Sequence, residues 1–270
     1  MKALIIRSSL YLLLASFAFT AAAQDPIDKG TGEVLGKTPL VETNDVGILY
    51  KYEMTVGFFT HSNGFGMNYR RGKNTTGYTK RIFEYEVATI KHAKEYKRYN
   101  PTKESKGYIF GKMNSLMTFR ASIGEQRIIA RKTDMGGIEI RYIYLAGVSM
   151  GVLKPVYLKI IEDGPNFQPD IVVEKYDPNK HGTFNIYGKA PALKGMDDLK
   201  LLPGGFAKFA LSFEYGNEPT KIRSLEVGAM LDVFYKNAPI MADIDTSDDL
   251  DPNNMFFFGF YVSLNFGKRW

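Results

Sequence analysis

Cysteine is absent from the 270-residue sequence, and tryptophan (one residue) and histidine (three) are nearly absent. Without cysteine the chain can form neither a disulfide nor a lipoprotein anchor, and three histidines are too few for a histidine-rich metal site. The formal net charge is +6, but the basic residues are scattered and no zinc-finger or RNA-binding signature occurs. We therefore expect no cofactor and no nucleic-acid partner.

The sequence also lacks long apolar runs. One short apolar run occurs near the N-terminus. This run extends from Leu10 to Phe19. The basic residues Lys2 and Arg7 precede it, and the small residues Ala21–Ala23 follow it. This stretch is shorter than the ~20 residues of a membrane-spanning helix, and a small-residue cleavage site comes directly after it. Residues 1–23 are therefore predicted to be a cleavable signal peptide for export.

What the sequence does contain is alternation. Residues 24–45 are rich in Gly, Pro, Thr and charge, which predicts a periplasmic extension. From residue 46 to residue 270, apolar and polar residues alternate with the period of a β-strand. The runs fall within residues 46–60, 65–69, 83–88, 113–123, 138–149, 208–215, 225–233 and 256–267. One apolar and one polar face per strand suits a secreted sandwich or a membrane barrel. Strand length, dense Tyr and Phe, and the export signal favour the barrel.

The sequence thus predicts an all-β fold, an antiparallel up-and-down transmembrane β-barrel of eight strands. With both chain ends on the periplasmic side, the extracellular connections are the longer ones, and residues 153–205 form the longest. Brief alternation within that connection, at residues 156–160 and 184–186, leaves a ten-stranded barrel as the alternative.

Strand parity also predicts which charged residues face the barrel interior. An eight-stranded barrel is just wide enough for its inward side chains to fill it. Both signs of charge occur at inward positions and could pair into a salt-bridge network. This network would act as a structural plug, or alternatively as a path for protons or ions. The predicted inward set is Lys51, Glu53, Glu84, Glu86, Arg120, Glu139, Arg141, Lys208, Glu214, Glu226 and Asp232.

Two short motifs bear on chemistry, and neither is complete. His61 and Ser62 faintly resemble the His-x-Ser-Asn pattern of lipid A deacylases, but adjacent residues on a strand point to opposite faces. We therefore expect no catalysis. The acidic segment 243–251 begins like a calcium loop but lacks the Gly and Glu that an EF-hand requires. Its candidate metal ligands are Asp243, Asp245, Asp249 and Asp251.

The last strand ends on aromatic residues, Phe266 and Trp270, which resemble the C-terminal signal read by the barrel-insertion machinery. Together with the signal peptide and the Tyr- and Phe-rich strands, they make the chain resemble the small outer-membrane barrels of Bacteroidota, with an OmpA/PorT-like barrel architecture. The resemblance implies a Gram-negative outer-membrane location and a non-enzymatic accessory subunit of a secretion or barrel-assembly complex. Its expected partners are outer-membrane lipid and lipopolysaccharide, the insertion machinery, and proteins bound by the extracellular loops. A small channel and an outer-leaflet lipid-modifying enzyme remain alternatives.

Overall fold

The computed structural model describes residues 50–100, 105–132, 137–163, 169–216, 218–242 and 253–270. All of them belong to one structural unit, Gly47–Trp270. The predicted signal peptide, the extension 24–45 and the acidic segment 243–251 lie outside the described residues. In the described part of the chain, no helix is long and apolar enough to cross a membrane.

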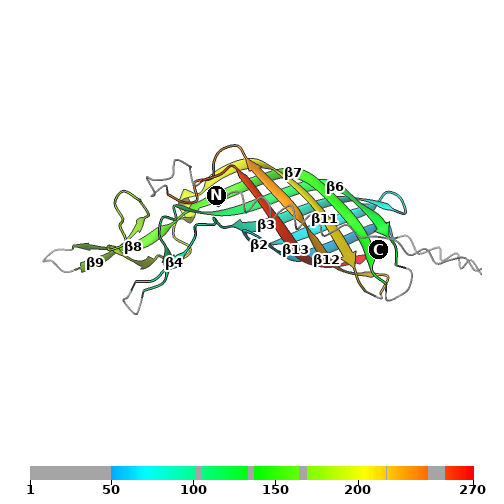
Figure 1. Ribbon diagram of the computed structural model, residues 1–270, viewed down its shortest axis with the longest axis horizontal. Coiled ribbons are helices and arrows are strands. Elements are labelled where there is room, and N and C mark those ends of the chain that lie inside the picture. The colour runs from blue at the N-terminus through cyan, green and yellow to red at the C-terminus, as the bar shows by residue number, and fades with distance from the viewer. Residues whose placement is uncertain (1–49, 101–104, 133–136, 164–168, 217, 243–252) are drawn as a thin grey trace, which may run out of the picture. The chain divides into compact units, whose positions relative to one another are not determined.

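Eight antiparallel strands form a closed barrel (Figure 1). Each strand pairs with the next barrel strand along the chain, and the last strand pairs with the first, so that Val56 lies opposite Phe266. This confirms the predicted eight-stranded up-and-down barrel. The barrel strands are β1 (Tyr52–His61), β2 (Gly64–Asn74), β3 (Thr79–Ile90), β6 (Asn114–Ala130), β7 (Glu139–Pro155), β11 (Lys200–Glu214), β12 (Lys221–Phe234) and β13 (Phe256–Arg269).

The alternation of the sequence separates the two faces of the barrel wall. In β1, Thr55 and Phe59 face inward and are buried, while Val56 and Phe58 face outward. Phe58 is 59% exposed, and in β13 Phe260 is 67% exposed. Large apolar side chains therefore cover the outside of the barrel, and most buried charged groups lie inside it.

Several strands are longer than the sequence pattern indicated. β6 and β7 have 17 residues each, and β11 already begins at Lys200. The Pro203-Gly204-Gly205 stretch, read as the end of the long connection, is thus part of a strand. The reason is that β7 supplies a paired neighbour along the whole of β11, and the Pro203 carbonyl still accepts a hydrogen bond from the Tyr235 amide at 3.0 Å.

The connections at the barrel end opposite Tyr52 and Trp270, which we call the loop end, form two small sheets. β8 (Tyr157–Asp163) pairs with β9 (Pro169–Lys175) and β10 (Ile186–Lys189), and β4 (Lys97–Arg98) pairs with β5 (Tyr108–Ile109). The ten-strand alternative is therefore wrong, because the extra alternating segments build this separate sheet. We call the two sheets the platform.

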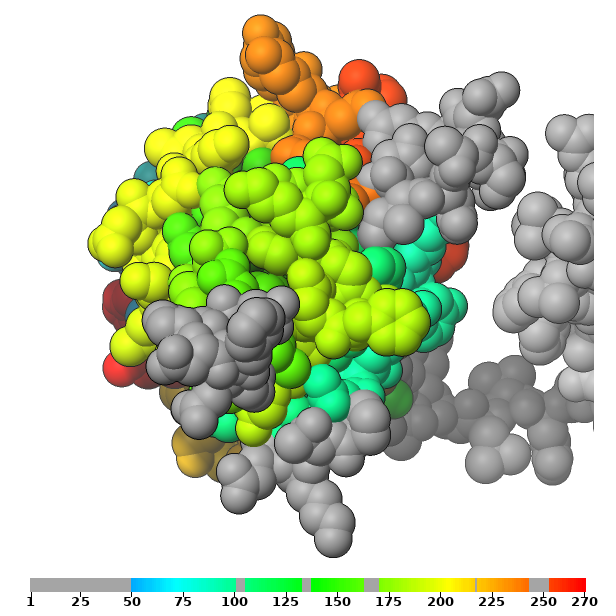
Figure 2. All heavy atoms as spheres, turned by 90° about the vertical axis from the view of Figure 1, so that its left-hand side faces the viewer, coloured from blue at the N-terminus to red at the C-terminus, as the bar shows by residue number. Residues whose placement is uncertain are grey.

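The platform has an apolar core of its own, which includes Leu158, Ile160 and Ile186. Viewed from the loop end, its yellow-green side chains occupy the centre of the molecule (Figure 2). A short 3-10 helix, η2 (Met196–Asp198), follows the platform and leads into β11.

Candidate functional site

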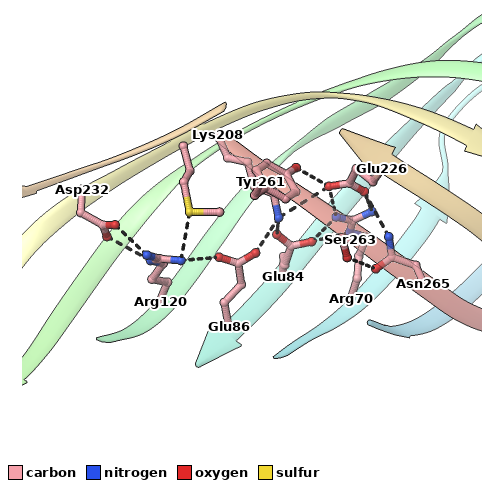
Figure 3. A network of polar contacts seen from close by, with 11 residues as sticks. Arg70, Glu84, Glu86, Arg120, Lys208, Glu226, Asp232, Tyr261, Ser263 and Asn265 are labelled. Carbon is pink, nitrogen blue, oxygen red and sulfur yellow. Dashed lines mark hydrogen bonds and ion pairs between the residues drawn. The ribbon is translucent and has the colours of Figure 1, made fainter. Parts of the chain in front are cut away.

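The barrel interior holds a network of paired charges (Figure 3). Lys208 of β11 lies at its centre with a fully buried side chain. The Lys208 Nζ donates hydrogen bonds to Oε1 of Glu84 at 2.8 Å and to Oε1 of Glu86 at 2.5 Å. Glu226 Oε1 lies 3.6 Å from the same Nζ. One ammonium group therefore compensates carboxylates that come from β3 and β12, on different parts of the wall.

Arg70 of β2 contacts two of the same carboxylates from the side of the barrel where Tyr52 and Trp270 lie. Its Nε donates to Glu84 Oε2 at 2.5 Å, and its Nη1 and Nη2 donate to the two oxygens of Glu226 at 2.9 and 3.2 Å. Glu226 also accepts hydrogen bonds from the Tyr261 hydroxyl and from the Asn265 amide. A buried carboxylate is stable only if its oxygens are paired in this way.

Arg120 of β6 extends the network toward the loop end. Its guanidinium holds both oxygens of Asp232, at 3.0 and 2.7 Å, in the paired arrangement that gives the strongest hydrogen bonds. Its Nη1 also reaches Glu86 Oε2 at 3.1 Å, and its face lies 4.7 Å from the ring centroid of Phe206. These side chains are all buried, and we call them the central network: Arg70, Glu84, Glu86, Arg120, Lys208, Glu226, Asp232, Tyr261 and Asn265.

A second charged group, the terminal-end cluster, fills the barrel where β1 begins and β13 ends. Glu214 pairs with Arg141 at 2.8 Å and with Arg269. Glu53 pairs with Lys80. Glu139 and Lys132 complete the cluster through further ion pairs with its members.

The two groups together contain seven carboxylates and seven cations. The formal charges of the central network and the terminal-end cluster therefore sum to zero. Ile82, Ile143 and Leu145 form an apolar layer of the interior.

The interior closes at the loop end with an apolar cluster. Ile240, 1% exposed, packs with Leu116, Leu153 and Phe234. The segment that carries it is fixed because the Ile240 carbonyl accepts hydrogen bonds from the Met113 and Asn114 amides at 2.9 and 3.2 Å. The space enclosed near His61 and Arg120 is only about 10 Å³, which is at most room for a single water molecule.

Of the charged residues predicted to face inward, all but one take part in these two groups. Lys51 is the exception and is a correction: it is exposed because β1 begins only at Tyr52, and its Nζ lies 5.6 Å from the centroid of the Tyr52 ring. Arg70, Lys80, Lys132 and Arg269 were missed because they lie outside the predicted alternating runs. Arg70 and Arg269 follow the runs 65–69 and 256–267, Lys80 precedes the run 83–88, and Lys132 lies well beyond the run 113–123. Extending the alternation by a few residues would have found Arg70, Lys80 and Arg269, whereas Lys132 follows the end of β6.

The other candidate residues are placed as follows. His61 faces the interior and is buried, whereas the Ser62 hydroxyl contacts the Phe260 backbone on an exposed side of the strand. The two side chains are thus not brought together. Phe266 is exposed on the outer wall, and Trp270 lies 6.4 Å from Tyr52, ring to ring.

Metal ligation finds no support among the described residues, where no group of three or more acidic or histidine side chains could hold an ion. The candidate ligands Asp243, Asp245, Asp249 and Asp251 lie outside the described residues.

An apolar outer wall around a charged, packed interior is the reverse of a water-soluble barrel. Exposed apolar patches on soluble proteins seldom exceed a few hundred Å², and here large apolar side chains are exposed on every barrel strand. Lipid is the solvent that such a wall fits. The fold and its interior define a small β-barrel of the outer-membrane type.

Comparisons with known proteins found similar solved structures but no similar sequence. No protein-family model and no curated protein matches the sequence. Among solved structures, one match is a crystal structure of Ail, the attachment invasion locus protein of Yersinia pestis, which was solved in complex with the heparin analogue sucrose octasulfate. That match has a TM-score of 0.39 and 8% identity, and covers 82% of this chain and 100% of Ail. Neisserial surface protein A matches with a TM-score of 0.38 and 6% identity, over 81% of this chain and 96% of that protein. At these TM-scores and identities, neither likeness carries an argument about what this chain does.

Proposed function

We propose that the chain is a non-enzymatic barrel of a Gram-negative outer membrane that carries a protein-docking platform, as an accessory subunit of a secretion or outer-membrane protein assembly machine. The observation that carries this proposal is the combination of a sealed barrel with a structured platform outside it. The resemblance to small Bacteroidota barrels of OmpA/PorT-like architecture agrees with the proposal and supplies the kind of machine.

The sealed interior argues against the channel alternative. A solute would have to pass the apolar cluster around Ile240, the central network and the terminal-end cluster in turn. Opening such a path would separate buried ion pairs, and breaking one pair of this kind is strongly unfavourable, by about 3–5 kcal/mol. We therefore expect no steady single-channel conductance from the protein in planar bilayers, and a stable open level would refute the sealed-barrel basis of the proposal.

The enzyme alternative loses its one candidate pair. A nucleophile and its base must lie within about 2.6–3.2 Å of each other, and His61 and Ser62 are on opposite sides of the strand end. The His61 Nδ1 accepts a hydrogen bond from the Asn63 amide at 3.3 Å, so it is not oriented toward the serine. Unchanged lipid A acylation in cells that carry His61→Ala and Ser62→Ala agrees with a non-enzymatic barrel.

The platform has the surface of a docking element. Phe184, between β9 and β10, is 98% exposed, and Leu193 is 80% exposed. β9 is an edge strand, and its outer side pairs with no strand in the described part of the chain. An exposed edge and exposed apolar side chains are features that partner proteins use, by adding a strand or by covering the patch.

The barrel wall and its last strand fit the remaining partners that we propose. Outer-membrane lipid and lipopolysaccharide surround the apolar wall, and the insertion machinery acts on the terminal strand through Phe266 and Trp270. Backbone hydrogen bonds of 2.9 and 3.0 Å between Trp270 and Tyr52 close the barrel at this strand. Replacing Trp270 by Ser is expected to slow membrane insertion.

The decisive experiment is affinity purification of the tagged full-length protein from detergent-solubilised outer membranes, followed by mass spectrometry. Stoichiometric recovery of a large barrel or secretion component supports the proposal. The double variant Phe184→Ser/Leu193→Ser should lose that partner while remaining folded. Tyr78→Ser is the matched control, because Tyr78 is also an exposed aromatic residue (61%) but lies at the opposite end of the barrel. A protein that purifies alone would refute the accessory role.

A further inference from the structure

A groove of about 570 Å³ lies on the outer wall of the barrel near the loop end. Its floor is a row of outward-facing side chains that the strand register places side by side, with Met117 opposite Val152 and Val152 opposite Leu201. Met196 of η2 and Leu199, which follows it, also line the groove. We call this feature the wall groove. Its size is that of a ligand pocket, and its floor is apolar.

Lysine residues border the wall groove on the side of the loop end. Lys154 lies two residues beyond Val152 along β7, opposite Ser115. Lys91 follows the end of β3, two residues beyond Thr89, which lies opposite Met117. Lys112 also lines the groove and precedes β6. The lysine rim therefore lies about two residues along the strands farther from the membrane centre than the apolar floor.

The rim keeps most of its charge. Lys112 is paired with Glu95 at 2.6 Å, which offsets one positive charge. Lys154 donates to a neutral acceptor, the Ala192 carbonyl, so its charge is not compensated there. For Lys91, which is exposed, no ion pair occurs within the described residues. The rim thus carries about two net positive charges.

We propose that the wall groove binds an anionic, phosphate-bearing lipid of the membrane leaflet at the loop end. The apolar floor takes an acyl chain, and the lysine rim takes the phosphate. Basic pockets at the headgroup level of a membrane bind anionic headgroups in this way, and lysine binds phosphate as a point charge. The inference rests on the proposed outer-membrane location, where this lipid is the lipid A part of lipopolysaccharide.

Two features favour a lipid over a free anion or a protein. The floor lies on the barrel wall that faces lipid hydrocarbon, where a soluble ion gains nothing from apolar side chains. η2 lines the groove with Met196, and its Asp198 pairs with Lys175 of the platform at 2.5 Å. The groove is therefore a preformed feature of the barrel wall and is separate from the exposed apolar residues of the platform.

The test uses the full-length protein in phosphatidylcholine nanodiscs that contain a small fraction of lipid A with both phosphates, and native mass spectrometry to measure bound lipid. The triple variant Lys91→Gln/Lys112→Gln/Lys154→Gln should bind roughly 125-fold more weakly, since it removes three positive charges near the headgroup and each is worth about fivefold. Lipid A without phosphates should bind the wild-type protein more weakly by a similar factor. Millimolar inorganic phosphate should not displace the bound lipid.

Two further variants separate the groove from general charge effects. Val152→Trp fills the floor without changing the charge and should also reduce binding. The matched control, Lys97→Gln/Lys180→Gln/Lys189→Gln, removes the same charge from exposed positions elsewhere on the platform and should bind as the wild type does. Equal binding by the rim variant and the control, or equal binding of lipid A with and without phosphates, would overturn the inference. Displacement by inorganic phosphate would also overturn it, in favour of a free anion.

Folding of each variant is checked by the mobility of the unheated protein on a denaturing gel. A folded barrel that retains no lipid A contradicts the wall-groove inference and leaves the proposed docking function intact. A barrel that retains lipid A but purifies from the outer membrane without a protein partner contradicts the docking function instead.

Discussion

Replacing Lys208 by Met tests whether the central network is sealed from water. The substitution keeps most of the side-chain volume but removes the ammonium group that lies 2.8 and 2.5 Å from two buried carboxylates and 3.6 Å from a third. Removing one partner of a buried ion pair typically destabilises a protein by about 3–5 kcal/mol, because the remaining charge is left uncompensated. That is a large share of the roughly 5–15 kcal/mol by which folded proteins are stable.

We expect Lys208→Met to lower the free energy of unfolding by about 3–5 kcal/mol. The assay is urea unfolding of the refolded protein in lipid vesicles, followed by the fluorescence of Trp270, the only tryptophan in the sequence. Lys200→Met is the matched control, because Lys200 belongs to the same strand but is exposed. Its effect should stay within about 0.5 kcal/mol.

A double variant isolates the charge from the packing. Glu84→Gln removes one of the carboxylates that Lys208 neutralises, so Lys208→Met/Glu84→Gln should be less destabilised than the two single variants predict together, by about 1–3 kcal/mol. If Lys208→Met behaves like the Lys200→Met control, water reaches the carboxylates and the sealed interior is refuted. The barrel would then be expected to conduct ions.

Two other predictions concern a close approach and a surface ion pair. A Cβ atom at Gly57 would lie 2.0 Å from Oδ1 of Asn265. Gly57→Val should therefore destabilise the barrel by about 1–3 kcal/mol in the same urea assay. Gly205→Ala is the control and should be as stable as the wild type, because a Cβ atom there would have no neighbouring atom within 4 Å. The hydrogen bond from Lys175 holds the pKa of Asp198 below its ordinary value of 3.8. The contact is therefore present above that value and is lost as the pH falls through the lowered pKa. In Lys175→Gln the pKa of the Asp198 carboxyl, followed by NMR, should rise, and an unchanged titration would contradict this pairing.

Strand parity predicted the fold and the lining of the barrel because both depend on a local period. A strand that separates lipid from a packed interior must alternate, and a one-residue shift would place its charges in the membrane. This constraint identified Glu226 and Asp232 as inward-facing from sequence. The constraint placed Lys51 inside the barrel wrongly, because the alternation in the sequence includes Lys51 although β1 begins only at Tyr52.

Strand ends were less predictable, and this is why Arg70 was missed. The alternation of Phe65, Met67 and Tyr69 is followed by Arg70-Arg71, which has the composition of a connection. The structure continues β2 to Asn74 because the neighbouring β3 supplies paired residues that far. Pairing between strands, which a single segment does not encode, thus sets where each strand ends.

The contacts within the network depend on closure of the whole barrel. Lys208 and Glu84 are separated by 124 positions in the sequence and meet because the register of each strand pair fixes the height of its side chains in the interior. Parity places a charge inside but does not give that height, so it cannot choose among the available partners. Because the partners come from β2, β3, β6, β11, β12 and β13, a register slip in any one pair would leave several buried charges unpaired. The network therefore penalises wrong registers as well as filling the barrel.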